Sequence, residues 1–492
     1  MSLVKAAPRG GGGTRLLASV LTVLCLCAAL LAAAPRAHAA PVAVLNGTQF
    51  TTPDGQPVHA HGGGVIKVDD FYYWFGENRQ EGGSNAFRYV SVYRSADLRT
   101  WEFRRNVLTQ SSSPELQSAN IERPKVVYNR ATGTFVMWMH KENATDYDEA
   151  RAAVAVSSTV DGDYRWQGSF RPLGQMSRDL TVFVDDDGAG YLVSAARDNA
   201  DLQIYRLSAD YTTVTALVAN PWPGGRREAP ALFKRGGVCF LLTSDATGWW
   251  PNQQQYATST GLAGGWSAMR NVGDSTAYGS QTAYVLPLQG TAGTSYLYLG
   301  DRWGNSIGGS VNDSRYVWLP LSFPDSRTLA MDWAPELTID AAAGTVTATG
   351  GPYQTLSARH SGKCVDVSDN AQSPGGPAIQ WPCSGENNQR FWARPAGDGS
   401  VQLVARHSSL CLAVSGASRQ AGAGIVQATC DSARAEQKWR LADAGGGYTR
   451  LVAGHSGMCL DVYDVSTADG AKLIQWTCGA DSANQQFHLQ AT

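Results

Sequence analysis

The last 140 residues of the chain repeat one pattern three times. In each repeat two cysteines enclose eighteen residues: Cys364 and Cys383, Cys411 and Cys430, and Cys459 and Cys478. The repeats start 47 and 48 residues apart, and each ends in Gln-x-aromatic: Gln389 with Phe391, Gln437 with Trp439, and Gln485 with Phe487. Self-similarity at a fixed period constrains the architecture more strongly than any local propensity. The C-terminal third is therefore predicted to consist of three like, strand-rich units.

This pattern resembles the ricin-type β-trefoil carbohydrate-binding module (family 13). The resemblance implies that each cysteine pair forms a disulfide within its own repeat. It also implies one sugar site per repeat, built from an Asp after the first Cys, an aromatic platform and a polar pair near Gln-x-aromatic. The first and third repeats keep all of these residues: Asp366, Trp381, Asn388 and Gln389, and Asp461, Trp476, Asn484 and Gln485.

The second repeat departs from the pattern. Ala413 replaces the aspartate, Ala428 replaces the tryptophan, and Glu436 precedes Gln437. Without the carboxylate and the stacking face a sugar has neither its hydrogen-bond partner nor its platform. We therefore expect two working sites of three. The glutamines of Gln-x-aromatic are weaker site candidates than the aspartates, because they are predicted to be mostly core.

Residues 1–39 are typical of a secretory signal peptide. Basic residues precede an apolar run, Leu16–Ala34, and Ala37-His38-Ala39 forms a small-x-small cleavage site. A membrane anchor is the alternative, but the cleavage site and the lack of later apolar spans favour secretion. Cys25 and Cys27 would leave with this segment, and disulfides in the repeats suit the same oxidising, extracellular destination.

Charge and the remaining cysteine exclude other functions. A formal net charge of −2 offers neither a basic face for nucleic acid nor a polybasic patch for a membrane. Cys239 lies in an apolar run, Val238–Leu242, and is predicted to be a buried, inert thiol. We expect a monomer whose partner is a polysaccharide, with no cofactor and no metal.

Residues 55–340 carry a weaker repeat. Five short apolar runs read as buried strands, and their starts lie 48 to 64 residues apart: Phe71–Phe75, Phe135–Met139, Gly190–Ser194, Val238–Leu242 and Ser295–Leu299. No helical pattern intervenes, and turn signals separate the runs. A period of this length with several strands per unit predicts a five-bladed β-propeller. The chain is thus expected to be all-β, with a propeller at 40–345, a linker at 346–354 and the β-trefoil at 355–492.

A short polar motif precedes each run by ten to fourteen residues. The five are His61-Gly62-Gly63, Glu122-Arg123-Pro124, Arg178-Asp179-Leu180, Glu228-Ala229-Pro230 and Ser280-Gln281-Thr282. Equivalent positions on successive innermost strands of a propeller converge on its axis. Three carboxylates and an amide would then share one pocket. Glycoside hydrolysis needs a protonated acid whose pKa a neighbouring charge or burial raises, together with a second group acting on water.

The first domain resembles glycoside hydrolase family 43, most strongly the subgroup of exo-β-1,3-galactanases. The resemblance rests on Phe71–Glu77, Ser91–Trp101, Ile121–Lys125, Arg178-Asp179, Arg227–Pro230 and Thr247-Gly248-Trp249. It implies that Glu228 is the general acid and that Asp179 raises the pKa of this acid and orients it. The family's usual base, a first-blade Asp, is missing, because the matching position is Gly62.

In the subgroup, an amide on the last blade is thought to hold the attacking water, and Gln281 matches it. Gln281 would position the attacking water in an inverting mechanism. If it also accepts the proton of that water, it would have to be an imidic-acid tautomer. Glu122 matches a glutamate that contacts the sugar, and its direct action as base is the competing assignment. The resemblance also implies sugar contacts from Glu77, Tyr147, Asn199, Thr247 and Trp249, although ordinary loop packing would explain each of them.

Three alternatives remain at this stage. An arabinofuranosidase or xylosidase of the same family is disfavoured by the absent first-blade Asp. A catalytically inactive propeller that binds glycans is suggested by the missing base, but the retained Glu228 and Asp179 count against it. His61, beside the glycines, is either a core histidine, which we favour, or a ligand of a structural ion on the axis.

Overall fold

The computed structural model describes residues 40–79 and 87–492. Within them the chain is all-β, as predicted: strands are joined by turns and single 3-10 turns, and none of these residues forms an α-helix. No described helix is long and apolar enough to cross a membrane. The predicted signal peptide at 1–39, with Cys25 and Cys27, lies outside the described residues.

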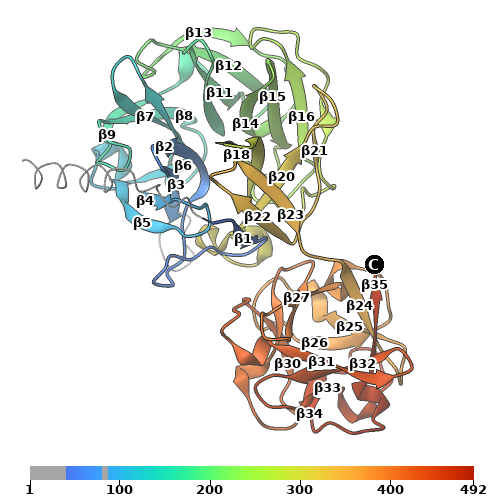
Figure 1. The fold of residues 1–492 in the computed structure, drawn as a ribbon. Helices are drawn as coiled ribbons and strands as arrows, with labels where there is room; N and C mark the ends of the chain where they lie inside the picture. The colour runs from blue at the N-terminus through green and yellow to red at the C-terminus, as the bar shows by residue number, and fades with distance from the viewer. Residues whose placement is uncertain (1–39, 80–86) are drawn as a thin grey trace, which may run out of the picture. The chain divides into compact units, whose positions relative to one another are not determined.

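The N-terminal part forms four-stranded antiparallel sheets in which consecutive strands are neighbours, and the described residues hold five of them (Figure 1). The first comprises β2 (His61–Val68), β3 (Phe71–Arg79), β4 (Phe87–Ser95) and β5 (Glu102–Thr109); the second β6 (Ala119–Asn129), β7 (Thr134–Asn143), β8 (Arg151–Ser157) and β9 (Arg165–Phe170). The third comprises β10 (Leu180–Val184), β11 (Gly190–Ala196), β12 (Asp201–Leu207) and β13 (Val214–Ala219). The fourth comprises β14 (Arg227–Arg235), β15 (Val238–Asp245), β16 (Gln255–Ser259) and β17 (Arg270–Asn271); the fifth β18 (Gln281–Gly290), β19 (Gly293–Arg302), β20 (Arg315–Ser322) and β21 (Ala330–Met331).

The apolar runs are the second strands of these sheets, and they are apolar on both faces because each sheet packs between two others. On β7, Val136 and Trp138 enter the core shared with the third sheet, whereas Met137 and Met139 enter the core shared with the first. Alternate residues of a strand point to opposite faces, so a strand covered on both sides has no polar face. This packing gives the sheets a propeller-like, blade arrangement.

The polar motifs lie at the start of the first strand of each sheet or directly before it, and the pairing beside three of them is irregular. The register with the second strand shifts between His61 and Gly64, between Glu122 and Lys125, and between Glu228 and Ala231. The first of the two residues inside each shift has a positive φ: Gly62 at 60°, Arg123 at 52° and Ala229 at 51°. A β-bulge bends the strand and redirects the neighbouring side chains. Figure 1 places β2, β6, β14 and β18 toward the middle of the domain, with β9, β13 and β21 at its rim.

A smaller sheet follows the five. It orders β1 (Val42–Leu45), β22 (Glu336–Asp340) and β23 (Thr345–Thr349), so the strand that precedes the first blade pairs with strands that follow the last. The predicted linker at 346–354 overlaps β23 and the next strand, β24. Only residues 350–352 of the predicted linker lie between these two strands.

The C-terminal part contains three similar four-strand units. The strands are β24 (Tyr353–Ala358), β25 (Cys364–Val367), β26 (Ala378–Trp381), β27 (Phe391–Pro395), β28 (Val401–Ala405), β29 (Cys411–Val414), β30 (Ile425–Ala428), β31 (Trp439–Gly445), β32 (Tyr448–Ala453), β33 (Cys459–Val462), β34 (Leu473–Trp476) and β35 (Phe487–Ala491). In each unit one disulfide lies within a hairpin, and the predicted pairing is confirmed: Cys364–Cys383, Cys411–Cys430 and Cys459–Cys478.

The core of this part repeats the same threefold pattern. The aromatic residues of Gln-x-aromatic, Phe391, Trp439 and Phe487, are fully buried in one cluster. β24 pairs with β35, which joins the two ends of the domain. The Gln-x-aromatic signature is therefore a core element, as the sequence predicts.

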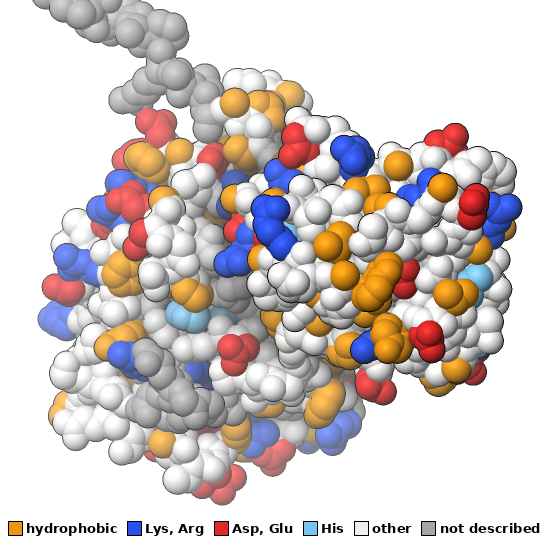
Figure 2. Space-filling model, turned by 90° about the horizontal axis from the view of Figure 1, so that it is seen from below, with side chains coloured by type: hydrophobic (Ala, Val, Ile, Leu, Met, Phe, Trp, Pro, Cys, Tyr) orange, Lys and Arg blue, Asp and Glu red, His pale blue; other side chains and the backbone are white. Residues whose placement is uncertain are grey.

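Two further features match the sequence. Cys239 is a free thiol that is buried, and burial raises its pKa to about 11. On the face shown in Figure 2, acidic and basic side chains are interspersed. A mixed surface of this kind does not create a strong field of one sign.

Gly76 on β3 tests the packing of the first sheet. A Cβ at this position would lie 2.0 Å from the backbone carbon of Ala60. We expect Gly76→Ala to lower the free energy of unfolding by about 3 kcal/mol or more, because two backbones would have to separate. Gly264→Ala is the control: its Cβ would meet no atom within 4 Å, and its effect should stay within about 0.5 kcal/mol. Denaturant titration of both variants measures the difference, and equal stability would contradict this account of the close approach.

Candidate functional site

A cavity of about 330 Å³ opens where the first strands of the five sheets begin. Most of the predicted site residues line it: Glu77, Glu122, Tyr147, Asp179, Asn199, Glu228, Trp249 and Gln281. Thr247 does not. Its hydroxyl donates a hydrogen bond to the Trp250 carbonyl oxygen and accepts one from Asn252, so it braces the loop that carries Trp249.

Glu228 has the properties of a proton donor. It is 5% exposed; its Oε1 accepts a hydrogen bond from Gln281 Nε2 at 3.0 Å, and its Oε2 accepts one from Asn199 Nδ2 at 3.0 Å. Burial, followed by the negative charge of Asp179, raises the pKa of Glu228 to about 8. A carboxyl group with this pKa holds its proton at neutral pH, as a general acid must.

Asp179 lies beside Glu228 and has a partner on each of its oxygens. Its Oδ1 pairs with Arg123 Nε at 2.8 Å, and its Oδ2 accepts a hydrogen bond from the Ala229 backbone N–H at 3.0 Å. Ala229 directly follows Glu228 and has a positive φ. The bulge in β14 thus aims a backbone donor at Asp179 and brings the two carboxyl groups together.

Arg123 connects this pair to the other sheets. Its Nη2 donates to Gln281 Oε1 at 2.6 Å and its Nη1 to the Thr282 carbonyl oxygen at 3.0 Å, while its backbone N–H donates to Glu77 Oε1 at 2.8 Å. Neighbouring carboxylates raise the pKa of Arg123 against the opposing effect of burial, so the guanidinium is a fixed cation. Sequence reasoning passed over this residue, although it stands in the Glu-Arg-Pro motif.

Gln281 uses its whole hydrogen-bonding capacity. Its Oε1 accepts from Arg123 and from Trp303 Nε1 at 2.8 Å, and its Nε2 donates to Glu228 and to Ser244 Oγ at 3.0 Å. An amide offers two donor hydrogens and two acceptor lone pairs. Two cationic or polar donors on the oxygen fix the amide form and its orientation.

Glu122 is held by a different set of groups. Its Oε1 accepts hydrogen bonds from Tyr147 Oη at 2.7 Å, Asn120 Nδ2 at 3.0 Å and Arg79 Nη2 at 3.1 Å. Its Oε2 forms an ion pair with His140 Nδ1 at 3.2 Å. Burial raises the pKa of Glu122, but His140 and Arg79 together outweigh it and hold the pKa well below its usual range.

His140 was not predicted as a site residue; it directly follows the apolar run on β7. Its Nε2 contacts Glu142 Oε1 at 2.7 Å, and the other Glu142 oxygen accepts from the Ala150 backbone N–H. Burial lowers its pKa, but the two glutamates prevail and raise it to about 9. The imidazole is therefore a cation at neutral pH, between two carboxylates.

Glu77 lies at the end of β3, opposite His61 in the sheet. Its Oε2 accepts a hydrogen bond from Arg79 Nη2 at 2.6 Å. Burial, with the charge of Glu122 adding to it, raises the pKa of Glu77 against the opposing effect of the two arginines. A Cβ on Gly62 would lie 2.4 Å from Glu77 Oε1, so the glycine leaves space for the carboxylate in its present position.

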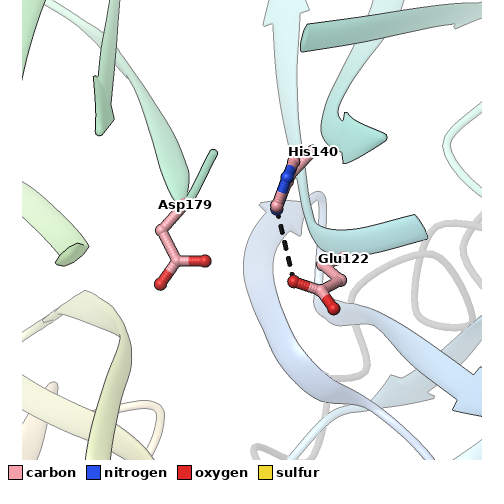
Figure 3. Close-up of side chains that lie close together, drawn as sticks. All are labelled: Glu122, His140 and Asp179. Carbon is pink, nitrogen blue, oxygen red and sulfur yellow. Dashed lines mark ion pairs between the residues drawn. The ribbon is translucent and has the colours of Figure 1, made fainter. Parts of the chain in front are cut away.

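Glu122, His140 and Asp179 form a cluster of potential metal ligands. These residues offer ligand atoms within 4.8 Å of one another, and Figure 3 shows the Asp179 carboxylate directed toward the space that Glu122 and His140 border from the other side. Each is already paired, Asp179 with Arg123 and the other two with each other. A fixed guanidinium and an imidazolium make this place unsuited to a cation. His61 is fully buried, stacks on Tyr316 and pairs with Asp301 at 3.1 Å, as a core histidine does.

The C-terminal domain has two candidate sugar sites, and the aspartate of each is held by the same two residue types. In the first repeat, Asn388 and Gln389 donate to the two oxygens of Asp366, at 3.0 and 2.8 Å. In the third, Asn484 and Gln485 donate to one oxygen of Asp461, also at 3.0 and 2.8 Å. The amides thus orient the aspartates.

The aromatic platforms stand free beside these aspartates. Trp381 is 44% exposed and Trp476 is 46% exposed. Each approaches a glycine of another repeat: a Cβ on Gly470 would lie 3.7 Å from Trp381, and one on Gly422 would lie 3.6 Å from Trp476. A Cβ on Gly375, the corresponding glycine of the first repeat, would meet nothing within 4 Å, since Ala428 offers no ring there.

The chain was compared with known proteins. Residues 59–303 match glycosyl hydrolases family 43, and residues 352–487 match the ricin-type beta-trefoil lectin domain. A comparison with curated proteins found no match.

Several solved structures are similar to the chain. An exo-β-1,3-galactanase from Clostridium thermocellum is 44% identical, covering 92% of this chain and 100% of that one, with a TM-score of 0.63. An exo-β-1,3-galactanase from Phanerochaete chrysosporium, determined with β-1,3-galactotriose, is 31% identical over 71% of this chain and 91% of that one, with a TM-score of 0.60. A family 43 β-1,3-galactosidase with galactodeoxynojirimycin is 33% identical over 59% of this chain and 99% of that one, with a TM-score of 0.55.

The two candidate sites of the C-terminal domain can be separated by mutation. We expect Asp366→Ala and Asp461→Ala each to weaken retention of the full-length chain in gels containing β-1,3-galactan, and the double variant to weaken it at least about tenfold, because each aspartate is the main hydrogen-bond acceptor of its site. Glu228→Gln in every sample keeps the polymer intact. Ala413→Asp is the matched control and should change nothing, since Ala428 offers no platform. Unchanged retention of the double variant would show that the sugar binds elsewhere.

Proposed function

The chain belongs to family 43 of the glycosyl hydrolases and is a glycosidase, and on this premise we propose that it is a secreted exo-β-1,3-galactanase. It releases galactose from the β-1,3-galactan backbone of arabinogalactan with inversion at the anomeric carbon. The observation that carries the proposal is Glu228, a buried carboxyl group whose pKa is raised to about 8 inside the cavity. The galactanase from Clostridium thermocellum, 44% identical over nearly the whole chain, supports the choice of substrate.

In the proposed reaction Glu228 protonates the glycosidic oxygen as the bond to the anomeric carbon breaks. The negative charge of Asp179 keeps Glu228 protonated before this step. Its ion pair with Arg123 holds Asp179 in position beside Glu228. The four hydrogen bonds of Gln281 favour a positioning role: one of its N–H groups orients Glu228, and its oxygen faces two donors. A proton on that oxygen, which the imidic-acid tautomer needs, would be opposed by the charge of Arg123.

Exo action follows in this proposal from the shape of the site. The five sheets are proposed to be the five blades of a closed propeller, with the cavity at one end of its axis. Lys125 is 1% exposed, and its Nζ donates to the Gly62 carbonyl oxygen at 2.6 Å. In this proposal its side chain forms the floor of the pocket. A pocket closed by such a floor accepts the end of a chain and excludes its middle.

The ricin-type domain would hold the enzyme on its polysaccharide through the Asp366 and Asp461 sites. Secretion is proposed from the signal-like residues 1–39 and from the three disulfides, which persist in oxidising compartments. The assembly is proposed to be a monomer.

A non-catalytic glycan-binding protein is the second candidate, and one observation favours it: Gly62 stands where the first blade of the family usually carries its base. An arabinofuranosidase or xylosidase is less compatible with the same glycine. Both candidates predict no galactose from β-1,3-galactan.

The test is product release from linear β-1,3-galactan. We expect wild type to release galactose and Glu228→Gln to release it at least about a hundredfold more slowly, because the amide cannot protonate the leaving oxygen. Chromatography of the products measures both rates. Absence of galactose from the wild type, with the polymer still bound, would refute the proposed activity and support the glycan-binding alternative.

The pH dependence of kcat/KM tests the role of Asp179. Because the pKa of Glu228 is raised, its proton is present below about pH 8, and activity should fall as the pH rises through 8. Asp179→Asn removes the neighbouring negative charge and should move this alkaline limb to lower pH, without abolishing hydrolysis at acidic pH. Asp198→Asn, at the rim of the cavity, is the matched control. An alkaline limb that stays in place would contradict the electrostatic role of Asp179.

A further inference from the structure

Inverting hydrolysis requires a group that takes a proton from the attacking water, and this role is unassigned among the residues that line the cavity. We propose that Glu77 is this general base. The inference rests on the proposed function and adds to it a second catalytic residue. It follows from the hydrogen-bond partners of each carboxylate and of Gln281.

Glu122 is more heavily engaged than Glu77. Tyr147, Asn120 and Arg79 all donate to its Oε1, and the His140 cation faces its Oε2. A water that approaches Glu122 must compete with these groups. The lowered pKa of Glu122 also makes it a weak base. Glu122 is therefore suited to binding sugar hydroxyls through its network and not to proton transfer.

The other candidates are also excluded. Asp179 is bound to Arg123 and to the Ala229 N–H, and it must stay charged to keep Glu228 protonated. Asp198 is 71% exposed and pairs with Arg178 at the rim. Gln281 has all four hydrogen-bonding positions occupied and is an amide.

Glu77 differs from all of these. Among the described residues it accepts two hydrogen bonds, one on each oxygen, from the Arg123 N–H and from Arg79 Nη2. Each oxygen keeps a further lone pair, and the residue lines the cavity. Burial raises its pKa, so its anion is a stronger base than that of Glu122.

The backbone beside Glu77 is shaped for it. Gly62, next to its strand partner His61, has a φ of 60° and carries no side chain, and a Cβ there would lie 2.4 Å from Glu77 Oε1. Because Gly62 on β2 has no side chain, the Glu77 carboxylate on β3 occupies the space beside it. Glu77 belongs to the first sheet and Glu228 to the fourth, and both line the cavity together with Gln281 from the fifth. The proposed mechanism needs room for one water between the two carboxyl groups.

The step balances as follows. The water oxygen bonds to the anomeric carbon of the terminal galactose while the bond from that carbon to the glycosidic oxygen of the remaining galactan chain breaks. Glu228 gives its proton to the leaving oxygen, and Glu77 takes a proton from the water. α-Galactose leaves, and the two carboxyl groups return to their starting states by exchange with solvent.

β-Galactosyl fluoride separates the two roles, because fluoride leaves without a proton from an acid. We expect Glu228→Gln to hydrolyse the fluoride within about tenfold of wild type while losing galactan hydrolysis at least about a hundredfold. Glu77→Gln should lose both reactions at least about a hundredfold while its circular dichroism spectrum stays that of the folded wild type. Glutamine keeps the acceptor for the Arg123 N–H but cannot take a proton.

Azide supplies the second measurement, since it attacks the anomeric carbon without a proton to remove. Azide should restore turnover of the fluoride by Glu77→Ala and yield α-galactosyl azide, identified by NMR, and should not do so for Glu122→Ala or Gln281→Ala. Rescue of either of these variants in place of Glu77→Ala would overturn the proposal. So would hydrolysis of the fluoride by Glu77→Gln within tenfold of wild type. A wild type inactive on both galactan and fluoride would instead refute the proposed function.

Discussion

The ion pair between Arg123 and Asp179 is the interaction on which the catalytic cavity depends. Arg123 comes from the second sheet and Asp179 from the start of the third, and the same guanidinium reaches Gln281 on the fifth. Removing either partner would leave a buried charge unpaired, at a cost of about 3–5 kcal/mol. One side chain thereby fixes the relative positions of sheets that share no backbone pairing.

The positive φ of Arg123 makes this arrangement possible. The bulge in β6 turns its guanidinium toward the axis and its N–H toward Glu77, while Glu122, one residue earlier, faces His140. Two adjacent residues therefore serve different parts of the cavity. The opposite pKa shifts of Glu122 and Glu228 follow from this division: both are buried, but a cationic histidine and an arginine face Glu122, whereas an anionic aspartate stands beside Glu228.

The strands and the residues around the cavity were predictable from the sequence because they follow periodic patterns. Runs such as Phe135–Met139 are apolar on both faces, and a polar motif lies ten to fourteen residues before each of them. The bulges were not predictable, because Arg123 and Ala229 are not residue types that favour a positive φ. His140 was missed for a related reason: it follows an apolar run, and only the register with Glu122 gives it a role.

The threefold repeat of the C-terminal domain has a further consequence. Its two complete candidate sites, around Asp366 and Asp461, lie on separate hairpins, β25–β26 and β33–β34. Two separate sites on one domain can engage two chains or two branches. Because Ala428 replaces the aromatic platform of the second repeat, the domain has two complete candidate sites instead of three. In a branched polysaccharide such a domain would act as a bridge between neighbouring strands of substrate.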